Sequence, residues 1–272
     1  MEPLVSVCIP AYNNAGYIKD TVESILQQTY QNIEVIVVDD NSTDDTVAVL
    51  ESISDERLKL YRNEQNLGMA GNWNKCLSLA NGEFVKLICA DDMIDRNAIE
   101  VEAKAMQENP TANLVESDTR LVDINGKKTG AFKRYRKSGL VDGKKLAHAA
   151  LIQKDFYGAP VNNLIRRSTL EKEGGFDPSF TYILDFDLWV TLSLSGDVYI
   201  IHKLLNSFRI RNDSNTGVLI GEKRDVYVAE HKKLLVKHKE AAGLSKAEVG
   251  LSMTIRRLRN VAIGVYLKLF AK

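Results

Sequence analysis

The chain has little of several residues that would assign it to a specialised class. It holds three cysteines, five prolines and four histidines in 272 residues. Cys8, Cys76 and Cys89 lie in or beside apolar runs and form no C-x-x-C pair, which indicates buried thiols in a reducing compartment and excludes a disulfide framework. The histidines lack the spacing of zinc ligands. Neither a zinc centre nor a histidine base is expected.

The sequence also lacks a leader, a membrane span and a net charge. Its start has no basic stretch followed by an apolar core and cleavage site, and no apolar run is long enough to cross a bilayer. A cytoplasmic location is therefore expected. The formal net charge is zero, so electrostatics give no reason to expect nucleic acid as a partner. The charge is unevenly placed, because residues 221–272 hold 12 Lys/Arg against 5 Asp/Glu, which leaves +7 there and −7 on residues 1–220.

The first part of the chain alternates apolar and amphipathic segments. Apolar runs predict four buried strands, at residues 4–9, 33–38, 58–62 and 84–90. Helical spacing predicts helices near residues 14–28, 44–53, 69–80 and 95–108. Pro10 lacks an N–H and is expected to end the first strand, and Gly82 to end the third helix. The alternation predicts an α/β fold with a mostly parallel sheet flanked by helices.

The sequence pattern changes at residue 113, where short segments begin in which apolar and polar residues alternate. They break at Asn125-Gly126, which is a hairpin signal. A helix at 185–195 and strands near 197–201 and 204–210 follow, and the chain ends in two predicted helices, 222–241 and 246–270.

These boundaries predict one domain with a C-terminal helical extension. Residues 1–112 would form the first half of this domain and residues 113–220 the second half, followed by the tail 221–272. In the second tail helix, apolar residues recur every three or four positions beside arginines. The tail is therefore expected either to pack on the preceding domain or on a second copy, or to lie on a membrane surface.

Segments with polar side chains follow three of the predicted strands. These segments are Pro10-Ala-Tyr-Asn13 after the first strand, Asp39-Asp40 after the second and Asp91-Asp92 after the fourth. In open parallel sheets, ligands bind outside the carboxyl ends of the strands. The first loop has no G-x-G-x-x-G, which argues against a dinucleotide-dependent oxidoreductase. It is also neither glycine-rich nor basic, which argues against a sugar-phosphate nucleotidyltransferase.

Two of these stretches carry a family resemblance. The segments VSVCIPAYNN (residues 5–14) and IEVIVVDDNSTDDT (residues 33–46) resemble glycosyltransferase family 2, whose members have the GT-A nucleotide-diphospho-sugar fold. The resemblance extends to about Gly217, and it implies that residues 1–112 form a nucleotide-binding half and residues 113–220 an acceptor-binding half. It implies an inverting enzyme that moves a sugar from a UDP-sugar to a hydroxyl of a carbohydrate or lipid-linked acceptor, in polysaccharide or glycan synthesis. The alternative is a weakly active or non-catalytic relative that binds nucleotide-sugar or glycan.

The resemblance assigns the first loop and the second strand to the nucleotide base. Pro10, Ala11, Tyr12 and Asn13 would wrap the base, and the ring of Tyr12 suits stacking on uracil. Asp39 would accept a hydrogen bond from the uracil ring N–H. The alternative to base stacking for Tyr12 is simple packing. The alternative to a ligand contact for the neighbouring Asp40 is local capping, and local capping is the preferred interpretation for Asp44.

Three further motif positions are assigned to the diphosphate. Asn66 and Gly68 open the third helix, whose N–H groups are a natural diphosphate neighbour, and Asn74 matches a polar position of that motif. Arg211 stands where the family usually has histidine, and a guanidinium could hold the diphosphate on two oxygens. Helix capping is the alternative for Asn74, and a surface salt bridge is the alternative for Arg211.

The segment Cys89-Ala-Asp91-Asp92 resembles the family's D-x-D motif, with Cys89 at the first acidic position. Asp91 and Asp92 are accordingly assigned to a divalent cation, Mn²⁺ or Mg²⁺, because carboxylate oxygens suit such hard ions. The cation would assist the departure of UDP. Capping of the helix at 95–108 is the alternative for this pair.

The segment Asp185-Phe-Asp-Leu-Trp189 resembles the family segment that carries the general base. Asp185 matches the carboxylate that removes the acceptor proton, and an ordinary helix start is the alternative. Trp73 stands where the family commonly has an arginine. The departures at Trp73, Cys89 and Arg211 are the features that favour a weakly active relative.

Overall fold

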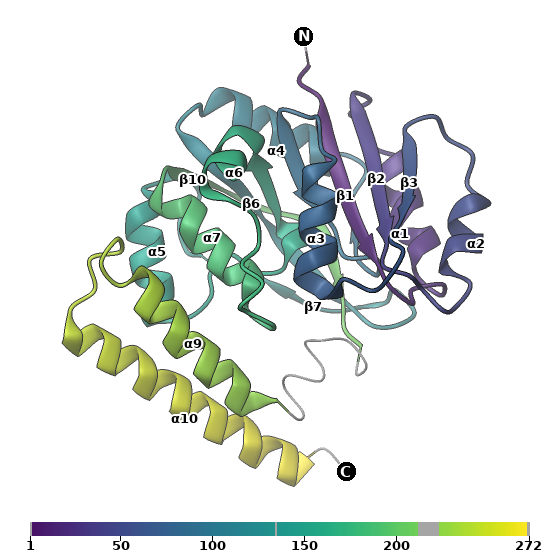
Figure 1. The fold of residues 1–272 in the computed structure, drawn as a ribbon. Helices are drawn as coiled ribbons and strands as arrows, with labels where there is room; N and C mark the ends of the chain where they lie inside the picture. Colours follow the sequence, from purple (N-terminus) through teal and green to yellow (C-terminus); the bar gives the residue numbers. More distant parts are fainter. Residues whose placement is uncertain (1, 134, 212–222, 271–272) are drawn as a thin grey trace.

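A computed structural model describes residues 2–133, 135–211 and 223–270, and the side chains of residues 224 and 263–270 are outside the description. Ten described strands form one sheet with helices on both faces (Figure 1). The elements of the first half are β1 (Val5–Ala11), α1 (Ile18–Leu26), β2 (Ile33–Asp39), α2 (Thr46–Glu51), β3 (Leu58–Arg62), α3 (Gly68–Ser78), β4 (Phe84–Leu87), β5 (Met93–Ile94) and α4 (Ala98–Glu108). Those of the second half are β6 (Ala112–Val122), β7 (Lys128–Phe132), β8 (Gly139–Val141), α5 (Gly143–Ile152), the 3₁₀ turn η1 (Pro160–Asn162), β9 (Asn163–Arg166), α6 (Arg167–Glu173), α7 (Leu184–Leu194), β10 (Asp197–Arg209), α9 (Arg224–His238) and α10 (Lys246–Phe270).

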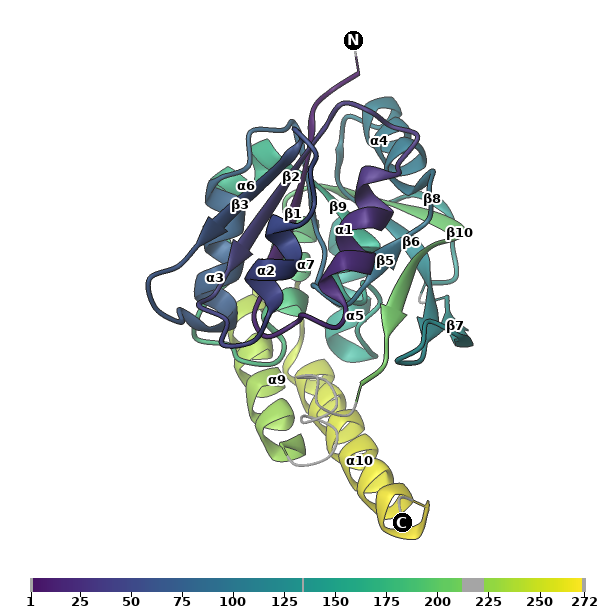
Figure 2. The ribbon, with the colours of Figure 1, turned by 90° about the vertical axis from the view of Figure 1, so that its right-hand side faces the viewer.

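The predicted parallel crossovers of the first half are confirmed. Strands β3, β2, β1 and β4 lie side by side in that order and pair in parallel. Val5, Val7 and Ile9 share a core with α1 and α4, whereas Cys8 packs with Cys76 of α3 on the other face. Figure 2 shows α1 and α4 on one side of the sheet and α3 and α6 on the other. The carboxyl ends of β1, β2 and β4 therefore meet along one edge.

Two expectations about the strands of the first half are wrong in detail. Pro10 does not end the first strand, because β1 continues to Ala11 with Pro10 opposite Val38. The neighbour β4 pairs with β1 only as far as Cys8, so Pro10 lies where β1 has a strand on one side, and a missing N–H is tolerated there. The strand β3 is also not buried, because it lies at the edge of the sheet.

Gly82 does not end the third helix, because α3 stops at Ser78. A Cβ at Gly82 would lie 2.6 Å from the backbone nitrogen of Ser6 and 2.7 Å from the carbonyl oxygen of Leu4. Such distances are far inside van der Waals contact, so only glycine allows this turn to approach β1 so closely.

The second half makes the sheet mixed. Strand β9 lies antiparallel between β4 and β6, and β10 runs parallel to β6 but antiparallel to β5 and β8. The predicted hairpin is confirmed by β6 and β7, with Gly126 at φ +78° in its turn. The two strands expected after residue 197 are one strand, β10, with register shifts between Ile201 and Asn206.

The predicted tail helices are confirmed as α9 and α10. They lie side by side and extend from the part of the molecule opposite the N-terminus (Figure 1). Helix α9 contacts α7, and α10 contacts α5. No described helix is long and apolar enough to span a membrane.

Candidate active site

The loop that follows β1 is tied to the loop that follows β2. The N–H of Asn13 donates to Ser42 Oγ at 2.9 Å, and Asn13 Oδ1 accepts from the N–H of Thr43 at 2.8 Å. Asn13 takes the left-handed conformation, φ +54°, that this double contact requires. Pro10 and Ala11 are buried in the strand, whereas Tyr12 is 47% exposed. The loop thus presents an aromatic ring to solvent at the carboxyl edge of the sheet.

Asp39 has a fully buried carboxylate, and one of its oxygens has no hydrogen-bond donor among the described residues. Its Oδ2 accepts from the N–H of Ser42 at 3.0 Å and lies 3.7 Å from Arg62 Nε. Its Oδ1 is buried and has no hydrogen-bond partner within the described residues. Because an unsatisfied buried acceptor is costly, this oxygen is suited to accept an N–H from a bound molecule.

Asp40 organises the start of α3, as its capping alternative expected. Its carboxylate accepts from the N–H of Leu67 at 2.8 Å, the N–H of Gly68 at 3.1 Å and Asn63 Nδ2 at 2.8 Å. Asn66 Nδ2 donates to the Asp40 carbonyl, and Asn66 Oδ1 accepts from Gly68. The two residues predicted to face the diphosphate, Asn66 and Gly68, are thus engaged in this turn.

Asn74 anchors the turn that precedes the predicted base. Its Oδ1 accepts from the N–H of Phe176, and its Nδ2 donates to the Phe176 carbonyl, both at 2.8 Å. A Cβ at Gly175 would lie 2.2 Å from Asn74 Oδ1, so any other residue there would displace the Asn74 amide from this turn. Trp73, on the same helix, packs edge-to-face on Phe176 at 4.9 Å. All the amide contacts described for Asn74 are with this turn.

Asp91 and Asp92 form an acidic pair beyond the end of β4. Asp92 is fully buried, and its Oδ1 accepts from the backbone N–H of Arg209 at 3.0 Å. Burial raises the pKa of Asp92 well above its ordinary value, and the charge of Asp91 raises it further. Burial also raises the pKa of Asp91, against the opposing effect of Arg211, whose Nη1 lies 3.2 Å from Asp91 Oδ2. A positive charge added beside this pair would stabilise both carboxylates.

Two arginines of the β10 region cover this acidic pair. The guanidinium of Arg209 donates to the Asp91 carbonyl at 2.9 Å and to the Ile124 carbonyl at 2.8 Å. The guanidinium groups of Arg209 and Arg211 lie over the ring of Tyr17, at 5.0 and 4.5 Å from its centroid. Sequence reasoning missed Arg209 and Tyr17. Residues 209 and 211 alternate, which is the strand signal that could have placed both arginines on one face.

Asp185 lies in the first turn of α7. Burial raises the pKa of the Cys89 thiol, and the charges of Asp92, Asp91 and Asp185 raise it further. The charge of Asp185, almost a hundred positions along the chain, is therefore within electrostatic reach of the thiol beside the Asp91–Asp92 pair. Asp187 is bound elsewhere, to Lys237 Nζ and His238 Nε2, both at 2.7 Å. The two acidic residues of this segment thus have different surroundings.

The acidic pair has features of a cation site. Asp92 Oδ2 is buried without a hydrogen-bond partner within the described residues, and Arg211 contacts Asp91 through a single oxygen. Hard oxygen donors of this kind fit Mg²⁺ or Mn²⁺. Across the described parts of the chain, no group of three or more His, Cys, Asp or Glu side chains is arranged to hold a metal. A cation here would therefore rely on the acidic pair together with oxygens from a bound ligand or water.

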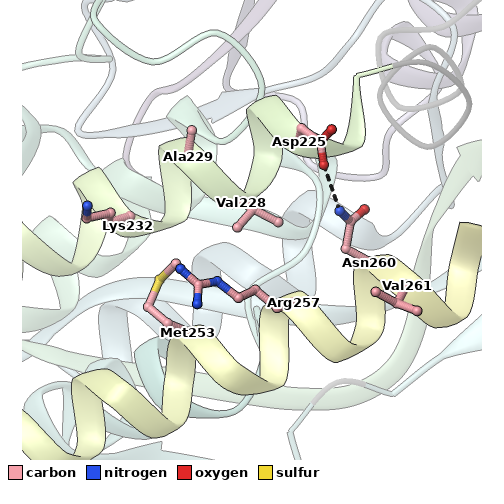
Figure 3. A pocket seen from close by; sticks show the side chains of 8 residues that line it. All are labelled: Asp225, Val228, Ala229, Lys232, Met253, Arg257, Asn260 and Val261. Carbon is pink, nitrogen blue, oxygen red and sulfur yellow. Dashed lines mark hydrogen bonds between the residues drawn. The ribbon is translucent and has the colours of Figure 1, made fainter.

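The motif that contains Arg211 continues through residues 212–216, which lie outside the described residues, as does the predicted boundary at residue 220. A separate hollow of about 540 Å³ lies between α9 and α10 (Figure 3). Asn260 Nδ2 donates to Asp225 Oδ1 across its end at 3.0 Å. None of the residues predicted for the active site lines this hollow.

Comparison with known proteins identifies the family. The model of glycosyl transferase family 2 matches residues 6–174. An uncharacterized glycosyltransferase of Haemophilus influenzae is 29% identical over 229 residues, which cover 82% of this chain and 70% of the relative.

Solved structures share the fold. TarS residues 1–349 from S. aureus, in complex with UDP-GlcNAc, matches with a TM-score of 0.74 at 21% identity, over 98% of this chain and 76% of that one. The mannosyltransferase PcManGT from Pyrobaculum calidifontis, in complex with GDP-Man and Mn²⁺, matches with a TM-score of 0.64 at 19% identity, over 99% and 76%. With its mixed sheet and helix-covered faces in the GT-A arrangement, the chain belongs to glycosyl transferase family 2 and is a glycosyltransferase.

Proposed function

We propose that this glycosyltransferase moves a sugar from a UDP-sugar to an acceptor hydroxyl with inversion at the anomeric carbon. The observation that carries the proposal is the acidic pair Asp91 and Asp92 beside Arg211, and it is supported by the charge of Asp185, which is among the causes that raise the pKa of Cys89. A carboxylate base and a cationic leaving-group site are the two parts that direct displacement of a nucleoside diphosphate needs. TarS, which shares the fold, is known in complex with UDP-GlcNAc.

The donor nucleotide would lie across the carboxyl ends of β1 and β2. The exposed ring of Tyr12 suits stacking on the base, and the buried Oδ1 of Asp39 is suited to accept the uracil N–H. Pro10, Ala11 and Asn13 would complete the wall around the base. The turn that begins α3 would support this wall, and it is held by hydrogen bonds among Asp40, Asn66 and Gly68.

The diphosphate would lie beside Arg211. Its guanidinium is paired with Asp91 and stacked on Tyr17, which fixes a fork of N–H donors next to the acidic pair. Asp91 and Asp92 are the residues that would hold Mn²⁺ or Mg²⁺. When bound, the cation would neutralise charge on the diphosphate.

Asp185 would act as the general base. Its carboxylate accepts the proton of the acceptor hydroxyl, whose oxygen then forms a bond to the anomeric carbon. The bond from that carbon to the diphosphate oxygen breaks on the opposite side, and UDP departs with the electron pair. Attack and departure on opposite sides invert the anomeric configuration.

A panel of UDP-sugars tests this function directly. The wild type is expected to release UDP from at least one donor and to bind UDP more tightly with Mn²⁺ by calorimetry. Asp185→Asn is expected to reduce turnover at least a hundredfold with nearly unchanged UDP binding. The matched control is Asp45→Asn, an exposed carboxylate at the start of α2. Normal turnover by Asp185→Asn would refute the base assignment, and UDP binding without any turnover would favour the non-catalytic alternative.

We further propose that the acceptor is a carbohydrate or lipid-linked saccharide of the cell envelope, used at the cytoplasmic face of the membrane. The surface of the tail supports membrane contact. Leu251, Leu258 and Val261 are more than half exposed, on a segment whose net charge is +7. Co-sedimentation with anionic and neutral vesicles tests this, with Leu258→Glu as the variant expected to release the protein. Equal sedimentation of both proteins would refute it, and a dimer detected by light scattering would support the alternative use of these helices.

A further inference from the structure

The carboxylate of Glu230 in α9 collects three backbone N–H groups from the segment that leads into α7. Its Oε1 accepts from the N–H of Thr181 at 2.6 Å, and its Oε2 accepts from Tyr182 at 3.0 Å and Ile183 at 3.2 Å. Glu230 is only 8% exposed, so solvent competes little for these bonds. The three bonded residues end two positions before Asp185.

This contact orders the approach to α7 from outside the helix. The first N–H groups of a helix have no partner inside the helix, and a side chain at the N-cap usually accepts one of them. The N-cap residue of α7 is Ile183, which has no acceptor on its side chain, and the N–H of Phe186 donates instead to Asp185 Oδ1 at 2.8 Å. Glu230 accepts from the N-cap N–H itself and from the two N–H groups before it, and hydrogen bonds to a carboxylate are among the stronger ones.

A second contact fixes the other side of Asp185. Asp187 is buried and accepts from Lys237 Nζ and His238 Nε2, both at 2.7 Å. Glu230, Lys237 and His238 are seven and eight residues apart, so they lie on one face of α9. The first turn of α7 is thus held to α9 on both sides of the predicted base.

The ring of Phe186 packs in the same interface. It lies nearly parallel to the ring of His231, at 14° and 6.5 Å between centroids, and the His231 ring in turn faces Tyr227 at 6.4 Å. The charge of Asp185 is one of the causes that raise the pKa of Tyr227, after burial and Asp155. Asp185 therefore lies within electrostatic reach of α9.

From these contacts we infer that Glu230 is a positioning residue for sugar transfer. It acts through the backbone of residues 181–183, which it holds so that the Asp185 carboxylate keeps one place relative to Asp91 and Asp92. The inference rests on the proposed role of Asp185 as base. It makes α9, which lies beyond the 6–174 segment matched by the family model, part of the catalytic apparatus.

The test compares Glu230→Gln with the wild type in full-length protein. Glutamine keeps the size of the side chain but turns an NH₂ group toward N–H donors, so it cannot accept all three bonds. Hydrogen exchange of residues 181–183 is expected to speed up at least tenfold, with residues of α1 unchanged. Turnover of the best UDP-sugar found for the wild type is expected to fall about ten- to a hundredfold in kcat, with the donor KM and UDP affinity within twofold.

Glu240→Gln is the matched control, because Glu240 is exposed and lies just beyond α9. Glu230→Asp, which keeps the charge on a shorter side chain, is expected to give an intermediate kcat and serves if the glutamine variant does not fold. Faster exchange with kcat within twofold of the wild type would overturn the inference, as would unchanged exchange. Normal turnover by Asp185→Asn would instead overturn the proposed function, whatever Glu230→Gln does.

Discussion

The buried position of His231 in α9 predicts that the fold loses stability in mild acid. The residue is fully buried, and its Nε2 lies 2.8 Å from Ser252 Oγ. The Ser252 hydroxyl donates to the Leu151 carbonyl, so it must accept from His231, which places the single ring proton of the neutral histidine on Nε2. Its Nδ1 is buried without a partner within the described residues. A second proton on Nδ1 would therefore place a charge in a buried site where the described residues offer Nδ1 no hydrogen-bond acceptor.

The cost of that proton follows from its pKa. Burial, assisted by the positive charge of Arg256, lowers the pKa of His231 from 6.5 to about 3. Because the folded pKa is the lower one, the unfolded chain binds the proton first as the pH falls, and stability decreases below about pH 6.5. Linkage gives a loss of about 2 kcal/mol between pH 7 and pH 5 from this one group.

Urea unfolding at pH 7, 6 and 5 measures the loss, with the fluorescence of the buried Trp73 and Trp189 as signal. His231→Gln keeps an N–H for Ser252 but cannot take up a proton, so its pH dependence is expected to be smaller than that of the wild type by about 2 kcal/mol. His202→Gln, at a partly exposed histidine, is the control. The same pH dependence in His231→Gln and the wild type would refute the reasoning.

Three further predictions concern the acidic site and the core. Arg211→Lys is expected to weaken UDP binding about tenfold in calorimetry, because a point charge replaces a two-point contact; unchanged affinity would leave Arg211 as a surface ion pair. Asp91→Ala is expected to remove the effect of Mn²⁺ on UDP binding, and a retained effect would exclude it as a ligand. Lys86→Met is expected to destabilise the fold by about 3–5 kcal/mol in urea, because it leaves the buried Glu102, now 2.8 Å from Lys86 Nζ, without its cation. The double variant with Glu102→Gln should recover much of that loss, and an additive loss would contradict this account.

The fold of the first half was predictable because its strands are apolar runs separated by helical segments. The predicted strand lengths were wrong where a neighbouring strand determines them. Pro10 is tolerated in β1 because the neighbouring strand β4 has already ended beside it. The antiparallel β9 was not predicted. Its four residues, Asn163–Arg166, carry two apolar side chains, and so short a run has no period that distinguishes a strand from a loop.

The acidic residues of the candidate site were assigned from motifs, but the residues that support them were not. Asp91, Asp92 and Asp185 stand in segments with a family resemblance, and their charges are among the causes that raise the pKa of Cys89. Arg209 and Glu230 form their contacts with residues about 45 to 190 positions away, so a local pattern does not show what they contact. Roles that depend on such distant backbone contacts appear only once the chain is folded.

The contact of Asn74 with Phe176 has a consequence for exchanging parts between family members. A hybrid that takes its acceptor-side residues from another family member could be joined at residue 174, where the segment matched by the family model ends. A hybrid joined there would pair Asn74 of one parent with the Gly175-Phe176 turn of another. In this chain the Asn74 amide makes two hydrogen bonds with the backbone of Phe176 and lies close against Gly175, so the two parts must match. Hybrids that carry α3 together with the turn and the following helices should remain active where those joined at residue 174 do not.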